Sequence, residues 1–176
     1  FEIDRLKRDC PILTENCRIK EHKAFDINKV VLLTTGNILI LFSYSFINKK
    51  IKILDVKKIE LLLERDENSQ SIATCKHSPF LLVNLFASKS EKVASRILIY
   101  KLLNGNSLKI LQSVNFHYEE IDHFSDFQFF DLRNKGVLLL VGITYAKKKC
   151  KIMSLVFKEK NEQFEFLGWK FRKEVD

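Results

Sequence analysis

The chain has 176 residues, of which 46% are hydrophobic, so it is long enough to bury a core and too apolar to be disordered throughout. Its net charge of +8 favours an anionic partner, such as nucleic acid or an acidic protein segment, and is equally typical of a solvated surface. Four dispersed cysteines exclude a disulfide-dense secreted framework and favour an intracellular protein, nuclear or cytoplasmic, and no apolar run is long enough for a membrane span.

Residues 1–28 are charge-rich, carry Pro11 and show no sustained period of 2 or 3.6. We interpret them as an N-terminal arm, docked on a sheet edge or on a partner, or as an irregular segment of a further β-unit. Because the chain begins with Phe1, we expect a processed product or a part of something longer. Residues 29–176 form the predicted β-domain, in which short apolar runs alternate with polar turns.

This domain contains three predicted units of four strands each. In each unit the second strand is the most continuously apolar, as expected for a strand covered on both faces. Asn104 and Gly105, between two apolar runs, are the strongest hairpin signal. The predicted strands are residues 30–34, 38–46, 51–56 and 59–64; then 71–75, 80–87, 96–102 and 108–114; then 127–132, 137–145, 151–157 and 164–171.

Ile51, Ile97 and Ile152 lie at matching places near the starts of the third predicted strands, so the units recur at a spacing typical of propeller blades. We therefore expect an all-β fold, with antiparallel four-stranded units arranged as blades of a partial or open β-propeller. A β-sandwich or barrel is the alternative. Since closed propellers have about four to eight blades, residues 1–28 or a partner would have to complete a ring.

The segment IKILDV, residues 51–56, resembles the blade-ending phrase of WD-repeat proteins, with Leu54 and Asp55 at the positions of the usual Trp-Asp. RILIYKL at residues 96–102 retains an aromatic residue and lacks the acid, KIMSLV at residues 151–156 lacks both, and the Gly-His pair of such repeats is absent. Residues 29–171 thus resemble degenerate WD-repeat blades, which implies a β-propeller.

Sequence motifs for nucleotide binding, zinc proteases and serine hydrolases are absent. The four histidines are dispersed, and no Ser or Cys lies in a recognisable nucleophile setting. The pairs Cys75/His77 and His117/His123 lack the spacing of a structural zinc site. We therefore expect no enzyme activity, metal, cofactor or small-molecule substrate.

The predicted connections between second and third strands are rich in lysine, and we expect them to share one face of the molecule with acidic connections between the units. A twelve-residue loop at 115–126 adds aromatic side chains, and long loops of this kind are often interaction sites. The predicted partner-binding residues are Lys49, Lys50, Lys89, Lys92, Lys147, Lys148, Lys149, Phe116, Tyr118 and Phe124.

These patterns predict a non-enzymatic scaffold for protein–protein interactions, a subunit or fragment of a larger intracellular complex whose partner completes the propeller. The alternative function is a basic nucleic-acid-associated domain, in which the loop lysines contact phosphates. The simplest interpretation of the same lysines is a solvated surface.

Overall fold

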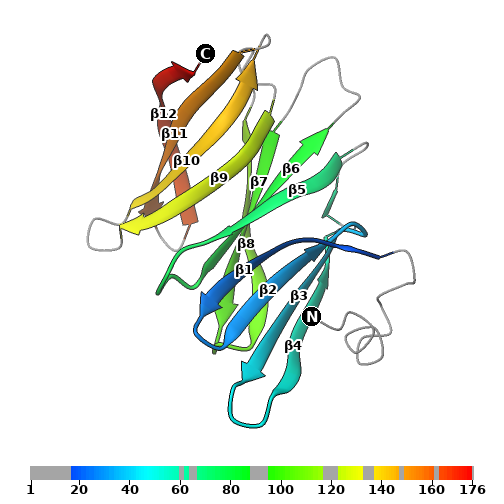
Figure 1. Cartoon of the computed structure of the whole chain (residues 1–176). Helices are drawn as coiled ribbons and strands as arrows, with labels where there is room; N and C mark the ends of the chain where they lie inside the picture. Colours follow the sequence, from blue (N-terminus) through cyan, green and yellow to red (C-terminus); the bar gives the residue numbers. More distant parts are fainter. Residues whose placement is uncertain are drawn as a thin grey trace.

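A computed structural model of the chain describes residues 17–59, 62–63, 67–87, 95–116, 123–132, 137–146, 149–160 and 163–175. The strands of this part of the chain form three antiparallel sheets of four strands each (Figure 1). The first sheet contains β1 (Ile19–Asp26), β2 (Lys29–Thr34), β3 (Ile38–Ser45) and β4 (Lys50–Lys58). The second contains β5 (Glu67–Thr74), β6 (Phe80–Ala87), β7 (Ser95–Leu103) and β8 (Ser107–Phe116), and the third β9 (His123–Leu132), β10 (Val137–Ala146), β11 (Lys149–Lys160) and β12 (Gln163–Val175).

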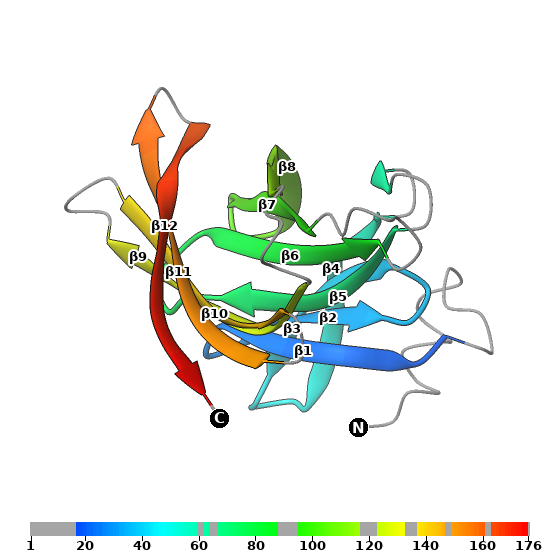
Figure 2. The same cartoon turned by 90° about the horizontal axis from the view of Figure 1, so that it is seen from above.

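Within each sheet the strands lie side by side in chain order, so every sheet is a simple meander. The three sheets follow one another in space, and their first strands, β1, β5 and β9, lie next to each other near the centre (Figures 1 and 2). No closed barrel forms within the described ranges. The expected all-β class is therefore confirmed, in an open arrangement of stacked four-stranded sheets. No helix in these ranges is long and apolar enough to cross a membrane.

The second sheet packs between the other two and is apolar on both faces. Side chains of successive residues on a strand point to opposite faces, so Leu81 and Val83 join a buried cluster with the first sheet. Leu82 joins a second cluster with the third sheet, where Phe80 packs edge-to-face on Phe164 with a centroid distance of 5.0 Å. This double burial explains the continuous apolar run of β6.

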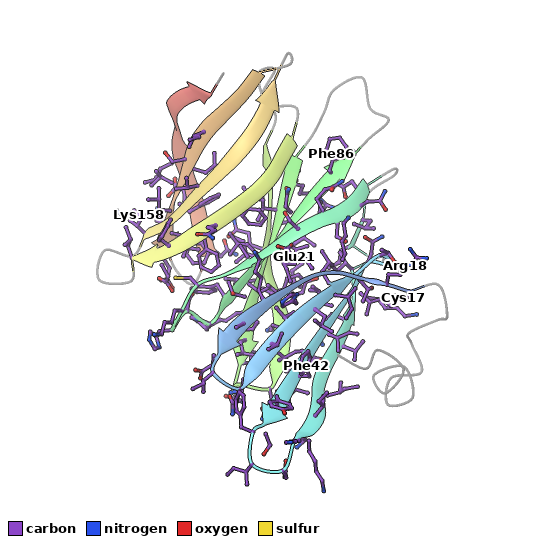
Figure 3. The ribbon with its side chains drawn as sticks, viewed as in Figure 1. Cys17, Arg18, Glu21, Phe42, Phe86 and Lys158 are labelled. Carbon is purple, nitrogen blue, oxygen red and sulfur yellow. The ribbon has the colours of Figure 1, made fainter. Side chains whose placement is uncertain are left out.

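A third buried cluster lies on the face of the first sheet that points away from the second. Its members are less than 10% exposed, and Phe42 is labelled among them in Figure 3. The apolar side chains at the centre of this face are therefore buried in the folded chain. The cluster contains Cys17, Leu32, Ile38, Ile40 and Phe42.

Polar side chains on the first strands tie the first two sheets together. The Glu21 carboxylate accepts a hydrogen bond from the backbone N–H of Ile72 at 2.6 Å, and Figure 3 shows Glu21 where β1 approaches β5. The Thr74 hydroxyl donates to the carbonyl oxygen of Ala24 at 2.7 Å. Since these two contacts advance together along β1 and β5, the two strands run in the same direction.

The fourth strands carry a second, repeated contact between sheets. Asp55 Oδ2 on β4 accepts a hydrogen bond from the backbone N–H of Leu108 at 2.7 Å. Gln112 on β8 accepts from the N–H of Phe164 and donates to its carbonyl oxygen, both at 2.7 Å. The two contacts join equivalent positions, because Leu108 and Phe164 are each the second residue of a fourth strand.

The predicted strands of the second and third units are confirmed, and the first unit is wrong by one strand. Its first strand is Ile19–Asp26, within the predicted arm, so the expected boundary at residue 29 passes through the first sheet. Ile59, Leu62 and Leu63 are not in a strand, contrary to the predicted strand at residues 59–64. Residues 51–56 consequently lie on a fourth strand, whereas Ile97 and Ile152 lie on third strands.

A buried ion pair lies at the end of the second sheet where β5 and β7 begin. Arg96 on β7 donates to both carboxylate oxygens of Glu67 on β5, and its Nη2 also donates to the carbonyl oxygen of Leu62 at 2.5 Å. The two side chains are only 11% and 4% exposed. Because a buried charge that loses its partner is costly, both residues are expected to be structurally sensitive.

Replacing Arg96 by Met should lower the free energy of unfolding by about 3–5 kcal/mol, because Glu67 would remain buried without its cation. The double variant Arg96→Met/Glu67→Leu should regain most of this loss. Urea unfolding measures both values, with Arg18→Met as the control at an exposed arginine. A double variant as unstable as Arg96→Met would contradict this explanation.

Candidate functional site

The predicted binding residues are only partly within the described structure. Lys49 and Lys50 are exposed in and beside the turn between β3 and β4. Lys149, Phe116 and Phe124 lie on strands β11, β8 and β9, with their backbone alone described. The remaining candidates, Lys89, Lys92, Lys147, Lys148 and Tyr118, lie outside the described residues.

The expectation of a single basic face is wrong for Lys49 and Lys50. In a meander, the turns after the first and third strands lie at one end of the sheet, and those after the second strand lie at the other. The β3–β4 turn is therefore at the opposite end from the places where β6 and β10 finish (Figure 1). Glu67, which falls in the predicted acidic connection between the first two units at residues 65–70, is instead buried against Arg96.

Exposed apolar side chains gather at the end of the first sheet that carries Lys49 and Lys50. Ile27 in the β1–β2 turn is 84% exposed, and Ile47 in the β3–β4 turn is 99% exposed. The two turns are neighbours, because Tyr44 N–H donates to the carbonyl oxygen of Asn28 at 2.8 Å. Sequence reasoning identified the lysines of this end and overlooked the isoleucines, since Ile27 lies in the predicted arm and Ile47 lies between two predicted strands.

The outer face of the third sheet, which points away from the second sheet, also carries exposed apolar side chains. Phe130, Leu139 and Val156 lie side by side across β9, β10 and β11. Phe130 is 47% exposed, whereas Phe129, which points toward the second sheet, is buried. We refer to Phe130, Leu132, Leu139 and Val156 as the outer face of the third sheet.

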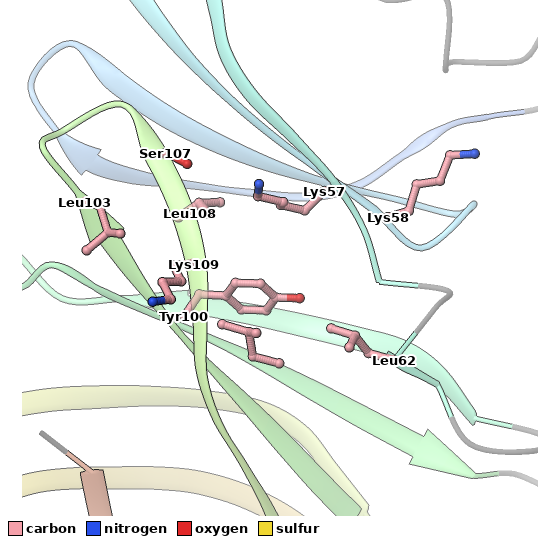
Figure 4. Close-up of a pocket in the computed structure, with 9 residues that line it drawn as sticks. Lys57, Lys58, Leu62, Tyr100, Leu103, Ser107, Leu108 and Lys109 are labelled. Atoms are coloured by element: carbon pink, nitrogen blue, oxygen red, sulfur yellow. The ribbon is translucent and has the colours of Figure 1, made fainter.

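A groove of about 430 Å³ opens between the first and second sheets (Figure 4). β4 forms one wall, with Lys57 and Lys58, and the β7–β8 hairpin forms the other, with Tyr100 between them. The walls of the groove are mostly apolar, as in many small-molecule sites. Its other described lining residues are Leu62, Leu103, Ser107, Leu108, Lys109 and Ile110.

The Tyr100 hydroxyl is the least satisfied polar group of this groove. The residue is 2% exposed, and its hydroxyl has no hydrogen-bond partner in the described part of the chain. Burial raises the pKa of Tyr100 to about 12, because the phenolate would be poorly solvated. The hydroxyl therefore stays protonated at neutral pH and is available as a donor.

Side chains for metal chemistry do not gather anywhere in the described ranges: no group of three or more His, Cys, Asp or Glu could hold an ion there. No protein-family model matches the chain, and no curated protein matches it.

Stability should fall between about pH 10 and pH 12 in part through Tyr100. Its pKa is raised in the folded state from an ordinary value near 10, so in this window the folded chain binds more protons than the unfolded chain and loses stability as the pH rises. In Tyr100→Phe the decline should be smaller. Urea unfolding at pH 9, 10, 11 and 12 measures this difference, and identical declines in the two proteins would refute it.

Proposed function

We propose that this protein is a non-enzymatic scaffold for protein–protein interactions in an intracellular complex, and that the outer face of the third sheet is its main docking surface. Free thiols at Cys17 and Cys75 are in keeping with a reducing compartment. The partner surface that fits this face is another β-sheet, because the equivalent faces of the first and second sheets are each covered by the next sheet.

The observation that best supports this proposal is that each of the three sheets contains an equivalent row of residues paired across its four strands. Each row starts from the third residue of the second strand, which is Val31, Leu82 or Leu139. Val31 is buried against the second sheet, and Leu82 is buried against the third. Leu139 has the same place and the same apolar character, yet it is only partly buried. The rows are Lys23, Val31, Leu41 and Asp55; Ala73, Leu82, Ile99 and Gln112; and Phe130, Leu139, Val156 and Gly168.

The end of each row indicates how a docked sheet would differ from the internal ones. Asp55 and Gln112 each bind the backbone of the next sheet, and the third row ends at Gly168, which has no side chain to do so. Glycine in a strand permits close approach of another backbone. A partner would thus be held at this face by apolar burial rather than by the polar contact that joins the internal sheets.

Within this proposal the three sheets are blades of an open, WD-repeat-like β-propeller, and the partner supplies further blade surface. The meander order and the neighbouring first strands support the propeller arrangement. Support for the WD-repeat likeness is weaker, because the best-matching phrase at residues 51–56 lies on β4 rather than on a third strand.

Phe130→Asp should abolish capture of the native partner by the full chain, because it places a charge in an interface that has to be apolar. Quantitative affinity capture from the source cells, with circular dichroism to verify folding, measures the loss. Ile47→Asp is the matched control, since Ile47 is more exposed than Phe130 and lies at the end of a different sheet.

Equal capture by Phe130→Asp and the unsubstituted chain would refute the docking surface. Capture that disappears after nuclease treatment, and falls steeply with salt, would support the nucleic-acid alternative, because phosphate contacts release counterions.

A further inference from the structure

Apolar side chains are exposed at the end of the first sheet where the β1–β2 and β3–β4 turns lie side by side. Phe46 is 64% exposed and Ile47 is 99% exposed, and Ile27 on the neighbouring turn is 84% exposed. Phe46 packs edge-to-face on Tyr44, with ring centroids 4.9 Å apart, and this contact fixes the ring without covering it. The β3–β4 turn lies at the lower extremity in Figure 1, and these side chains face solvent in the folded chain.

Equivalent turns of the second sheet show that the fold does not require apolar residues at these places. The β7–β8 turn, which corresponds to the β3–β4 turn, consists of Asn104, Gly105 and Asn106, the residue types that tight turns favour. The β5–β6 turn, which corresponds to the β1–β2 turn, carries the exposed polar residues Lys76 and His77. The apolar turns of the first sheet therefore depart from the repeat.

Lysines outnumber acidic residues at this end of the first sheet. Residues 26–29 and 43–52 contain four lysines and one aspartate. Lys49, Lys50 and Lys52 are exposed, and none of them forms an ion pair within the described ranges. Lys49 has a φ of 53°, a left-handed conformation that Asn or Gly would adopt at lower cost. A positive charge is thus present at this turn in spite of the backbone conformation it has to adopt.

We refer to the exposed apolar and basic residues of these two turns as the basic apolar tip, which comprises Ile27, Phe46, Ile47, Lys49 and Lys50. We infer that the tip inserts into the surface of an anionic lipid bilayer. Apolar side chains that enter the boundary between headgroups and acyl chains, and lysines that pair with anionic headgroups, are the two contributions to peripheral membrane binding. Because a strand rises about 3.3 Å per residue, Lys52 lies about 7 Å behind Lys50 along β4. Both amines are therefore at headgroup depth when Ile47 enters the acyl boundary, about 5–10 Å deep.

The composition of the tip favours a bilayer over a macromolecular partner. Lysine is depleted in protein–protein interfaces, whose energetically dominant residues are mostly Trp, Tyr and Arg. A single-stranded nucleic acid needs aromatic faces among the amines, and Ile27 and Ile47 offer none. Two convex turns can enter a fluid bilayer surface without a complementary pocket, whereas a folded partner would have to provide one.

Co-sedimentation of the full chain with phosphatidylcholine vesicles that contain about 30% phosphatidylserine tests the inference. We expect saturable binding, about tenfold or more tighter than to vesicles of phosphatidylcholine alone. Lys49→Gln/Lys50→Gln should weaken this binding about tenfold or more, because each lysine near an anionic surface contributes about fivefold. The matched control is Arg18→Gln/Lys58→Gln, which removes two exposed cations from the opposite end of the same sheet. It should change the affinity less than about twofold, because salt screens charges beyond about 8 Å.

A second set of variants distinguishes insertion from adsorption by charge alone. Ile47→Ser should weaken binding about tenfold, because an apolar side chain no longer enters the bilayer. Leu167→Ser is its control, since Leu167 is 55% exposed on β12 of the third sheet. Brominated lipid should quench the added fluorescence of Ile47→Trp in the bound protein and leave that of the unsubstituted chain, whose single tryptophan is Trp169 on β12, unchanged.

Absence of saturable binding, or equal binding to the two kinds of vesicle, would overturn the inference. Equal weakening by the two lysine and arginine variants would show a general charge effect, and unquenched Ile47→Trp in the bound protein would show adsorption without insertion, so each would also overturn it. Duplex binding that is lost in Lys49→Gln/Lys50→Gln, without vesicle binding, would assign the tip to nucleic acid instead.

These outcomes are independent of the partner-capture experiment, since Phe130 and the basic apolar tip lie on different sheets. Capture from a detergent extract, in which no bilayer is present, keeps Ile47→Asp a valid control there. Loss of either proposal therefore leaves the other standing.

Discussion

Burial of the second sheet on both of its faces is the constraint from which most of this structure follows. A four-stranded sheet covered on one face needs alternating apolar and polar residues, but β6 has to supply apolar side chains in both directions. Leu81 and Leu82 are adjacent in the chain, and they are buried in different clusters. The order of the three sheets is therefore encoded in the hydrophobicity of the middle one, and the outermost faces are the places where apolar residues call for another explanation.

Stacking by apolar burial alone would let the sheets slide, and the polar contacts between them oppose this. Glu21 binds a backbone group of β5, and Asp55 and Gln112 bind backbone groups at the starts of β8 and β12. Each such contact satisfies an amide that would otherwise be unpaired, and a missing bond of this kind costs about 1–3 kcal/mol. Side chains that look like ordinary surface residues in the sequence thus determine how neighbouring sheets are aligned.

The same contacts explain which strands could be predicted from the sequence. The repeat, the apolar second strands and the hairpin at Asn104 and Gly105 predicted eleven strands in the correct units, eight of them at the correct place within the unit, since local pattern and burial agree there. β1 was missed because Glu21 and Lys23 interrupt its apolar pattern, and Glu21 is needed between sheets rather than in a core. Ile59 led to the opposite error, a predicted strand that does not form. Its side chain is fully buried, yet it belongs to a connection, where its N–H donates to the carbonyl oxygen of Asn37.

The groove was beyond prediction for a related reason, because its lining comes from β4 and from a hairpin about 50 residues further along the chain, and only the stacking brings these together. A difference between equivalent positions was nevertheless visible once the register was known. Where the third sheet has Phe157 and Phe164, the second has Tyr100 and Leu108, so one interface is filled by rings and the other retains a space with a polar group beside it. In a repeated structure the fold requires only what recurs. The residues that depart from the repeat, here Tyr100 with its hydroxyl and the partly exposed face around Leu139, are therefore not explained by the packing of neighbouring sheets alone.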